Sequence, residues 1–169
     1  MRDTISIPRV KLLHPAVREE VTRLIDAIEA TWPVNMAIRI VQGLRTIKEQ
    51  DALYAQGRTK PGKKVTNAKG GSSFHNYGLS IDFALLYDKD GNGSYETLSW
   101  DIKKDSNNNK RADWMEVVDF FKTAGWSWGG EWHSILDYPH LEKSFGHSVK
   151  ELKRRYDAHE VINDYIKLD

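Results

Sequence analysis

Residues 73–86 constrain the fold most, because they join two candidate metal ligands to a segment that predicts a buried strand. His75 and Asp82 lie on either side of Gly78, and the apolar residues 83–86 follow directly. A carboxylate at the start of an apolar run needs a partner that offsets its desolvation, and a bound cation supplies one. An ordinary loop histidine and a turn aspartate are the alternative interpretation.

The residue types of these candidate ligands favour zinc. Neutral imidazole and carboxylate suit zinc at neutral pH, and a chain without cysteine cannot build the thiolate cages typical of structural zinc. A catalytic zinc takes three protein ligands and leaves its fourth position to water, so a third ligand must come from elsewhere in the chain. Residues 137–140, Asp-Tyr-Pro-His, are the candidate stretch, and His140 is the candidate ligand.

The whole pattern resembles the zinc peptidases that include the D-Ala-D-Ala carboxypeptidases and dipeptidases and the L-alanyl-D-glutamate endolysins. Their Ser-x-His-x-x-Gly-x-Ala-x-Asp motif is met here at Ser73, His75, Gly78 and Asp82. Ser80 stands where the family usually has alanine, which exchanges one small residue for another. The resemblance covers about residues 38–142, and its motifs are specific in combination rather than singly.

The second half of the pattern supplies the general base. In the family this base is an Asp or Glu three residues before the last histidine ligand, a spacing that Asp137 and His140 satisfy. Glu131 and His133 are the rivals for catalytic roles, with a loop surface as their alternative. The sequence Trp-Gly-Gly-Glu-Trp, followed by Asp-Tyr-Pro-His, is similar to the L-alanyl-D-glutamate branch in particular.

The resemblance implies a zinc-dependent peptidoglycan endopeptidase that hydrolyses the L-Ala-D-Glu bond of the stem peptide. Zinc would be held by His75, Asp82 and His140, and it would acidify a water molecule whose proton Asp137 accepts and returns to the leaving amine. Two alternatives stay open. One is a D-Ala-D-Ala carboxypeptidase or dipeptidase, and the other is a non-catalytic wall-binding or calcium-binding module.

Arg45 is a further candidate because of its position. A predicted strand over residues 36–42 and a predicted helix over residues 46–56 place it at a strand-to-helix junction, where an arginine is by default a surface cation or a salt-bridge partner. The family carries an arginine in a similar Gly-x-Arg-Thr/Ser setting. The resemblance therefore implies that Arg45 stabilises the oxyanion or holds a substrate carboxylate. Gln50 and Ser73 are candidate substrate-binding residues.

The remaining periodicity predicts an α+β fold, in which a small, mainly antiparallel sheet packs against helices and carries the zinc site on its open face. Apolar residues recur at helical spacing over residues 14–31 and 112–123. We expect residues 1–146 to form the catalytic domain. Residues 147–169, whose apolar positions up to Ile166 keep a roughly helical spacing, are either a closing helical extension or the start of a linker.

Charge and composition exclude several classes of partner. The chain has 25 basic and 24 acidic side chains, so nothing in it demands nucleic acid or an anionic membrane. The first eight residues lack a basic segment followed by an apolar core, and no run approaches the about 18 apolar residues of a membrane helix. We therefore expect a monomer made in the cytoplasm without a signal peptide. It would act on peptidoglycan after release, as a phage or prophage endolysin.

Each of three polar loops has two alternative interpretations. Residues 88–96 open like a calcium loop but lack its final glutamate, so a hairpin turn is the alternative. Residues 105–113 are similarly rich in oxygen side chains, with the same alternatives. The basic run over residues 58–64 is either solvated surface or a contact for an anionic wall polymer.

Overall fold

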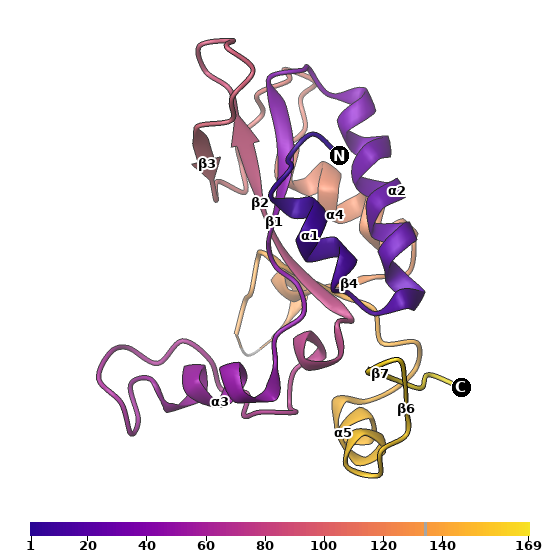
Figure 1. Ribbon diagram of the computed structural model, residues 1–169. Coiled ribbons are helices and arrows are strands. Elements are labelled where there is room, and N and C mark those ends of the chain that lie inside the picture. Colours follow the sequence, from indigo (N-terminus) through magenta and orange to yellow (C-terminus); the bar gives the residue numbers. More distant parts are fainter. Residues whose placement is uncertain (134) are drawn as a thin grey trace.

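Strand β2 (Ser80–Tyr87) is the centre of the sheet in the computed structural model, which describes every residue except Ser134 (Figure 1). Strand β1 (Met36–Gln42) pairs with one edge of β2 along most of its length. The other edge is shared, because β5 (His140–Glu142) pairs with the beginning of β2 and β3 (Thr97–Ser99) pairs with its end. All of these pairs are antiparallel, which confirms the predicted α+β fold with a mainly antiparallel sheet.

Helices α2 (Pro15–Thr31) and α4 (Asp113–Thr123) pack against the sheet and against each other (Figure 1). Both were predicted from their apolar stripes, and α2 begins where expected because Pro15 suits a first helical turn. Strand β4 (Ser127–Trp128) follows α4 and pairs with β5. The core between these layers contains Val17, Val21, Ile25, Ile28, Ile38, Ile40, Phe83, Leu85, Trp114, Val118 and Phe121.

A short helix that the periodicity did not predict, α1 (Ser6–Lys11), closes the free edge of β1. The Ser6 hydroxyl accepts a hydrogen bond of 2.8 Å from the Ile40 backbone N–H. Two residues earlier on the same strand, a Glu29 carboxylate oxygen accepts one of 3.0 Å from the N–H of Ile38. These side chains take the place of a further strand, so the edge presents no unpaired donors at these positions for another chain to bind.

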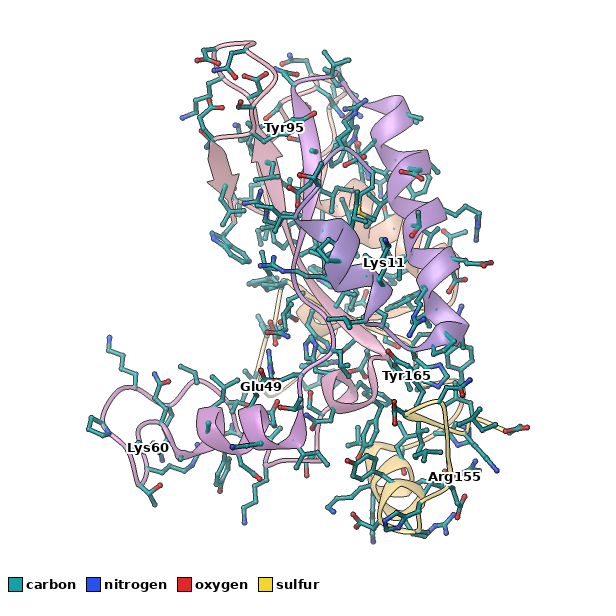
Figure 2. All side chains as sticks on the ribbon, viewed as in Figure 1. Lys11, Glu49, Lys60, Tyr95, Arg155 and Tyr165 are labelled. Carbon is teal, nitrogen blue, oxygen red and sulfur yellow. The ribbon has the colours of Figure 1, made fainter. Side chains whose placement is uncertain are left out.

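Helix α3 (Ile47–Ala55) extends away from the sheet together with the basic loop that follows it (Figures 1 and 2). Lys60 lies near the far end of this loop in Figure 2. Thr46 and Glu49 form a capping box that defines where the helix begins. Gln50 is the only fully buried side chain of α3, so this helix is joined to the body mainly through a polar residue.

The C-terminal segment begins with helix α5 (Val149–Asp157) and ends in a two-stranded hairpin of β6 (Val161–Ile162) and β7 (Tyr165–Ile166). The apolar spacing of this segment therefore corresponds to one helix followed by a hairpin. Asn163 and Asp164 have φ values of +49° and +69°. Two consecutive left-handed residues form the tight turn that joins adjacent strands, and asparagine and aspartate tolerate this conformation.

The hairpin packs against the N-terminal part of the chain. The Ile166 carbonyl accepts a 2.8 Å hydrogen bond from Nε2 of His14, and the Tyr165 hydroxyl donates to the Leu12 carbonyl at 3.1 Å. Figure 2 shows Tyr165 where the tail meets the body. Ile166 is buried in the main core. Among the described residues, no helix has the length and apolar character needed to span a membrane.

Candidate metal centre

Three separate elements supply the candidate metal ligands. His75 lies on the short 3-10 helix η1 (Phe74–Tyr77), Asp82 on β2 and His140 on β5. Asp82 and His140 are cross-strand partners, so the sheet register itself brings them together. Gly78 joins η1 to β2 with φ of +66°, and a Cβ atom there would lie 2.7 Å from the His14 backbone nitrogen. Glycine is thus required where the chain turns His75 toward the strand.

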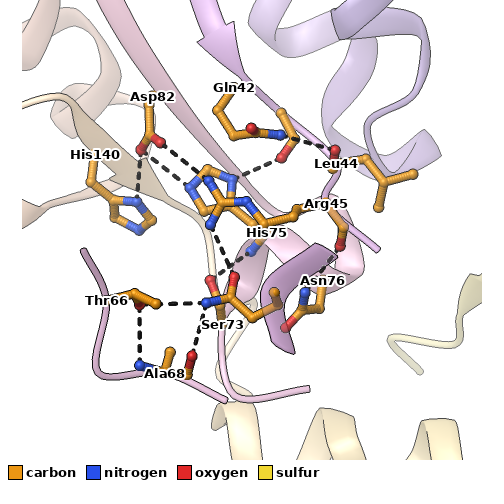
Figure 3. Close-up of polar contacts among 12 residues, drawn as sticks. Gln42, Leu44, Arg45, Thr66, Ala68, Ser73, His75, Asn76, Asp82 and His140 are labelled. Atoms are coloured by element: carbon orange, nitrogen blue, oxygen red, sulfur yellow. Dashed lines mark hydrogen bonds and ion pairs between the residues drawn. The ribbon is translucent and has the colours of Figure 1, made fainter. Parts of the chain in front are cut away.

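The three side chains converge on one carboxylate oxygen (Figure 3). Oδ1 of Asp82 lies 3.2 Å from Nε2 of His75 and 3.1 Å from Nδ1 of His140. The three candidate ligand atoms all lie within 4.8 Å of one another. Ligand atoms about 2.0–2.1 Å from a tetrahedral zinc are about 3.3 Å apart, so the spacing around Oδ1 fits zinc closely.

The other nitrogen of each ring decides which atom is free to bind a metal. Nδ1 of His75 donates to the Gly43 carbonyl at 2.7 Å, and Nε2 of His140 donates to Oε2 of Glu142 at 2.9 Å. In a neutral ring, each remaining nitrogen then has a lone pair that faces the Asp82 carboxylate. Acceptors facing one another require a cation or a proton between them. The donor set of two imidazoles and one carboxylate fits zinc.

Electrostatics favour an ionised Asp82 at the centre of this cluster. Burial raises the pKa of Asp82, but the hydrogen bonds from His140 and His75 outweigh burial and hold it well below its usual range. Burial lowers the pKa of His140, whereas its hydrogen bonds to Asp82 and Glu142 raise the pKa to about 9. The site therefore holds a carboxylate anion at neutral pH and attracts positive charge, whether a proton or a metal ion.

Arg45 reaches the same carboxylate from the end of β1. The register of β1 against β2 shifts between Ile40 and Gln42, and irregularities of this kind re-aim the chain beside functional sites. The Arg45 backbone N–H then donates to the His75 carbonyl at 2.9 Å, and one guanidinium nitrogen lies 3.9 Å from Oδ2 of Asp82. The predicted strand-to-helix junction thus places Arg45 beside the candidate ligands.

Gln50 is buried behind Arg45 and has no exposed area. Its side-chain oxygen accepts a hydrogen bond of 2.9 Å from Nη1 of Arg45, and its Nε2 donates to the Ala68 carbonyl at 2.9 Å. Any contribution of Gln50 to substrate binding therefore passes through Arg45. Ser73 is half-buried, and its hydroxyl accepts a bond from the His75 N–H at 3.3 Å, which helps to define the start of η1.

Asp137 lies close enough to the cluster to respond to its charges. Burial raises the pKa of Asp137, the Asp82 carboxylate raises it further, and the nearby histidines oppose this rise. Its backbone N–H donates to the Gly129 carbonyl at 3.0 Å, and a Cβ atom on Gly129 would lie 2.5 Å from the Asp137 carbonyl. Of its rivals, Glu131 is exposed and forms an ion pair with Lys122, and His133 is also exposed.

Comparisons with known proteins show the family of this chain. A family model described as D-alanyl-D-alanine carboxypeptidase matches residues 66–143. The chain is also 50% identical, over 132 residues, to the peptidoglycan L-alanyl-D-glutamate endopeptidase CwlK of Bacillus subtilis (strain 168). That match covers 77% of this chain and 72% of CwlK. The chain therefore belongs to the D-alanyl-D-alanine carboxypeptidase family of metallopeptidases, which the family model describes.

One further relative and one solved structure are less similar to this chain. The L-alanyl-D-glutamate peptidase of Listeria phage A118 is 23% identical over 140 residues, which cover 83% of this chain and 41% of the phage protein. The crystal structure of the L-Ala D-Glu endopeptidase ChiX of Serratia marcescens has a TM-score of 0.51 at 17% identity. It covers 84% of this chain and 88% of ChiX, so the fold is shared.

Several residues around this candidate metal centre do not follow from the sequence motif. Glu142 contacts His140, and Nδ2 of Asn76 donates to the Arg45 carbonyl at 3.0 Å. The indole of Trp132 packs with its ring centre 5.1 Å from that of His140, and 37% of Trp132 is exposed. Glu142 and Asn76 each lie within two residues of a ligand, which is the one signal in the sequence that points to them.

The two polar loops outside the site are turns in the peptidase fold. Residues 88–96 connect β2 to β3, which confirms the predicted hairpin turn. Carboxylate oxygens of Asp88, Asp90 and Glu96 lie within 4.8 Å of one another, and Asp88 accepts hydrogen bonds from two backbone N–H groups of the turn. In residues 105–113, Asp105 accepts bonds from the backbone in the same way.

Proposed function

We propose that this protein is a zinc-dependent peptidoglycan endopeptidase that hydrolyses the L-Ala-D-Glu bond of the stem peptide. The observation that carries the proposal is the convergence of His75, Asp82 and His140 on one point beside Arg45. The bond specificity is supported by the 50% identity to an L-alanyl-D-glutamate endopeptidase over most of the chain.

Zinc would be held by Nε2 of His75, the Asp82 carboxylate and Nδ1 of His140. Bound zinc supplies Lewis acidity, which acidifies water and polarises a carbonyl. The protein's own contribution to the proton transfers is Asp137. Its carboxylate accepts a proton from the attacking water and later delivers that proton to the nitrogen of the leaving D-Glu. The rise in the pKa of Asp137 brings it nearer to neutrality, as general acid-base catalysis favours.

Arg45 stabilises negative charge on the substrate. Its guanidinium is held in place by a hydrogen bond to the side-chain oxygen of Gln50. As water adds to the L-Ala carbonyl, negative charge develops on its oxygen, and a fixed guanidinium stabilises that charge without reorganising. Ser73 and the exposed face of Trp132 contact the peptide next to the scissile bond.

The biological setting we propose is wall lysis by a monomer. The similarity to a phage peptidase supports an endolysin role, and the greater identity to a Bacillus subtilis protein supports a bacterial or prophage wall hydrolase of the same specificity. The lysines of residues 58–64, which include Lys60 near the far end of the loop, contribute attraction to anionic wall polymers.

The test is digestion of purified peptidoglycan with the metal-loaded protein, followed by mass and end-group analysis of the products. Cleavage between L-Ala and D-Glu creates a new amino terminus on D-Glu and releases no free D-Ala. Release of D-Ala alone would instead favour a D-Ala-D-Ala carboxypeptidase, and wall binding without either product would favour a non-catalytic module. Activity should disappear in excess chelator and return when zinc is restored.

A further inference from the structure

Glu142 is a part-buried carboxylate with one polar contact. It lies two residues after His140 on β5, so both side chains are on the same face of the strand. Its Oε2 lies 2.9 Å from Nε2 of His140, and its side chain is 19% exposed. The strand partners are Asp82 for His140 and Ser80 for Glu142, so both residues are held by the same ladder, one pair (Ile81 with Leu141) apart.

We propose that Glu142 is a positioning residue that fixes His140 as an Nδ1 ligand of the metal. This inference rests on the proposed function, because it assumes that the site binds zinc. A neutral imidazole carries one proton, and the carboxylate accepts the hydrogen bond only when that proton is on Nε2. Nδ1 is then left with its lone pair facing Oδ1 of Asp82, 3.1 Å away. The contact thus selects both the tautomer and the orientation of the ring.

The two histidines of the site are held in different ways, and this difference makes Glu142 testable. The ring of His75 is fixed by the Gly43 backbone carbonyl at 2.7 Å, which no side-chain substitution removes. The ring of His140 is fixed by a side chain. A carboxylate behind a ligating imidazole also makes the ring a stronger ligand, and such partners are worth about 10- to 100-fold in metal affinity.

A merely structural role for Glu142 makes a different prediction. An ion pair that only supports β5 would change the stability of the metal-free protein and leave zinc affinity unchanged. If Glu142 positions His140, its loss weakens zinc binding even in variants that are folded. Glutamine separates hydrogen bonding from charge, because its side-chain oxygen still accepts from Nε2 while the negative charge is gone.

The experiment measures zinc affinity by competition with a chromophoric chelator, using the full chain. We expect E142A to weaken zinc binding by about 10- to 100-fold and E142Q to weaken it by less. The matched control is E131Q, which removes the same charge from an exposed carboxylate and should bind zinc like the wild type. The visible spectrum of the cobalt-substituted protein gives a second readout, which should change in E142A and not in E131Q.

The outcomes separate this inference from the proposed function. Wild-type zinc affinity together with an unchanged cobalt spectrum in E142A overturns the role of Glu142 alone. Release of D-Ala by the zinc-loaded wild type overturns only the bond specificity. A wild-type protein that binds no zinc overturns both. If E142A does not fold, E142Q decides, and wild-type affinity in that variant counts against the inference.

Discussion

Nη1 of Arg45 donates a hydrogen bond of 2.9 Å to the side-chain oxygen of Gln50, which is completely buried. A guanidinium stabilises a developing oxyanion well only if it is already in place, and Gln50 is the side chain that holds this one from behind. Gln50 in turn donates to the Ala68 carbonyl at the end of the basic loop. The arm formed by α3 and its loop is thereby linked to the candidate active site.

We expect Gln50→Ala to lower kcat/KM by about 10- to 100-fold, because a hydrogen bond to a charged group is worth about 1.5–3 kcal/mol. Zinc content should not change, since Gln50 contacts no candidate ligand. Steady-state kinetics with a stem peptide and metal analysis measure the two effects. Lys48→Ala, an exposed position on the same helix, is the control. Wild-type kcat/KM in Gln50→Ala would show that Arg45 does not depend on this contact.

The assignment of the general base predicts that Asp137→Asn loses about 10²- to 10⁴-fold in kcat and keeps its zinc. Glu131→Gln should be close to the wild type, because that carboxylate is exposed and paired with Lys122. Turnover and zinc content are measured side by side in both variants. An inactive Glu131→Gln beside an active Asp137→Asn would reverse the assignment.

The C-terminal hairpin offers a test of how strongly the tail stabilises the fold. Ile166 is 4% exposed and packs in the core, whereas Ile162 on the neighbouring strand is 56% exposed. Removing a buried isoleucine side chain costs about 2–5 kcal/mol, so Ile166→Ala should lower the free energy of unfolding by that amount. Ile162→Ala should change it by less than about 0.5 kcal/mol. Urea unfolding measures the free energy of unfolding of both variants. If Ile166→Ala loses as little stability as Ile162→Ala, the tail is not part of the cooperative unit.

His14 predicts a pH dependence of stability. Burial lowers the pKa of His14 and Arg18 lowers it further, against the opposing hydrogen bond to Ile166. Nδ1 of His14 accepts the Ala16 N–H at 3.1 Å as the N-cap of α2, and protonation of Nδ1 breaks that bond. Since the folded state binds this proton less readily than the unfolded state, stability should fall as pH falls below about 6.5.

The comparison for this prediction is His14→Asn, because asparagine also caps helices but does not titrate in this range. Unfolding free energies from pH 8 to pH 5.5, at one zinc concentration, should show the wild type losing stability relative to the variant as pH falls. Effects of the other histidines are common to both proteins and cancel in the difference. Parallel curves would mean that His14 is not linked to folding.

The sequence by itself determined the elements with strong local signals. The helices α2 and α4 and the strand β1 follow from apolar periodicity, because that spacing alone defines which face of an element is buried. The residue types at His75, Asp82 and His140 suit zinc, and the resemblance of the whole pattern to a zinc peptidase family led to the prediction of a metal site. Where a conformation depends on neighbours close in the chain, the pattern was sufficient.

Only the tertiary structure decided how these residues act together. The pairing of β2 with β5 brings Asp82 against His140, which is 58 positions away in the chain, and the same register aligns Glu142 behind the ring. In the tail, the left-handed turn at Asn163 and Asp164 and the burial of Ile166 against distant residues give a hairpin after α5, which the apolar spacing does not show. Contacts between segments far apart in sequence leave no periodic signal, so ring orientation, buried partners and the support of Arg45 by Gln50 emerge only when the chain is folded.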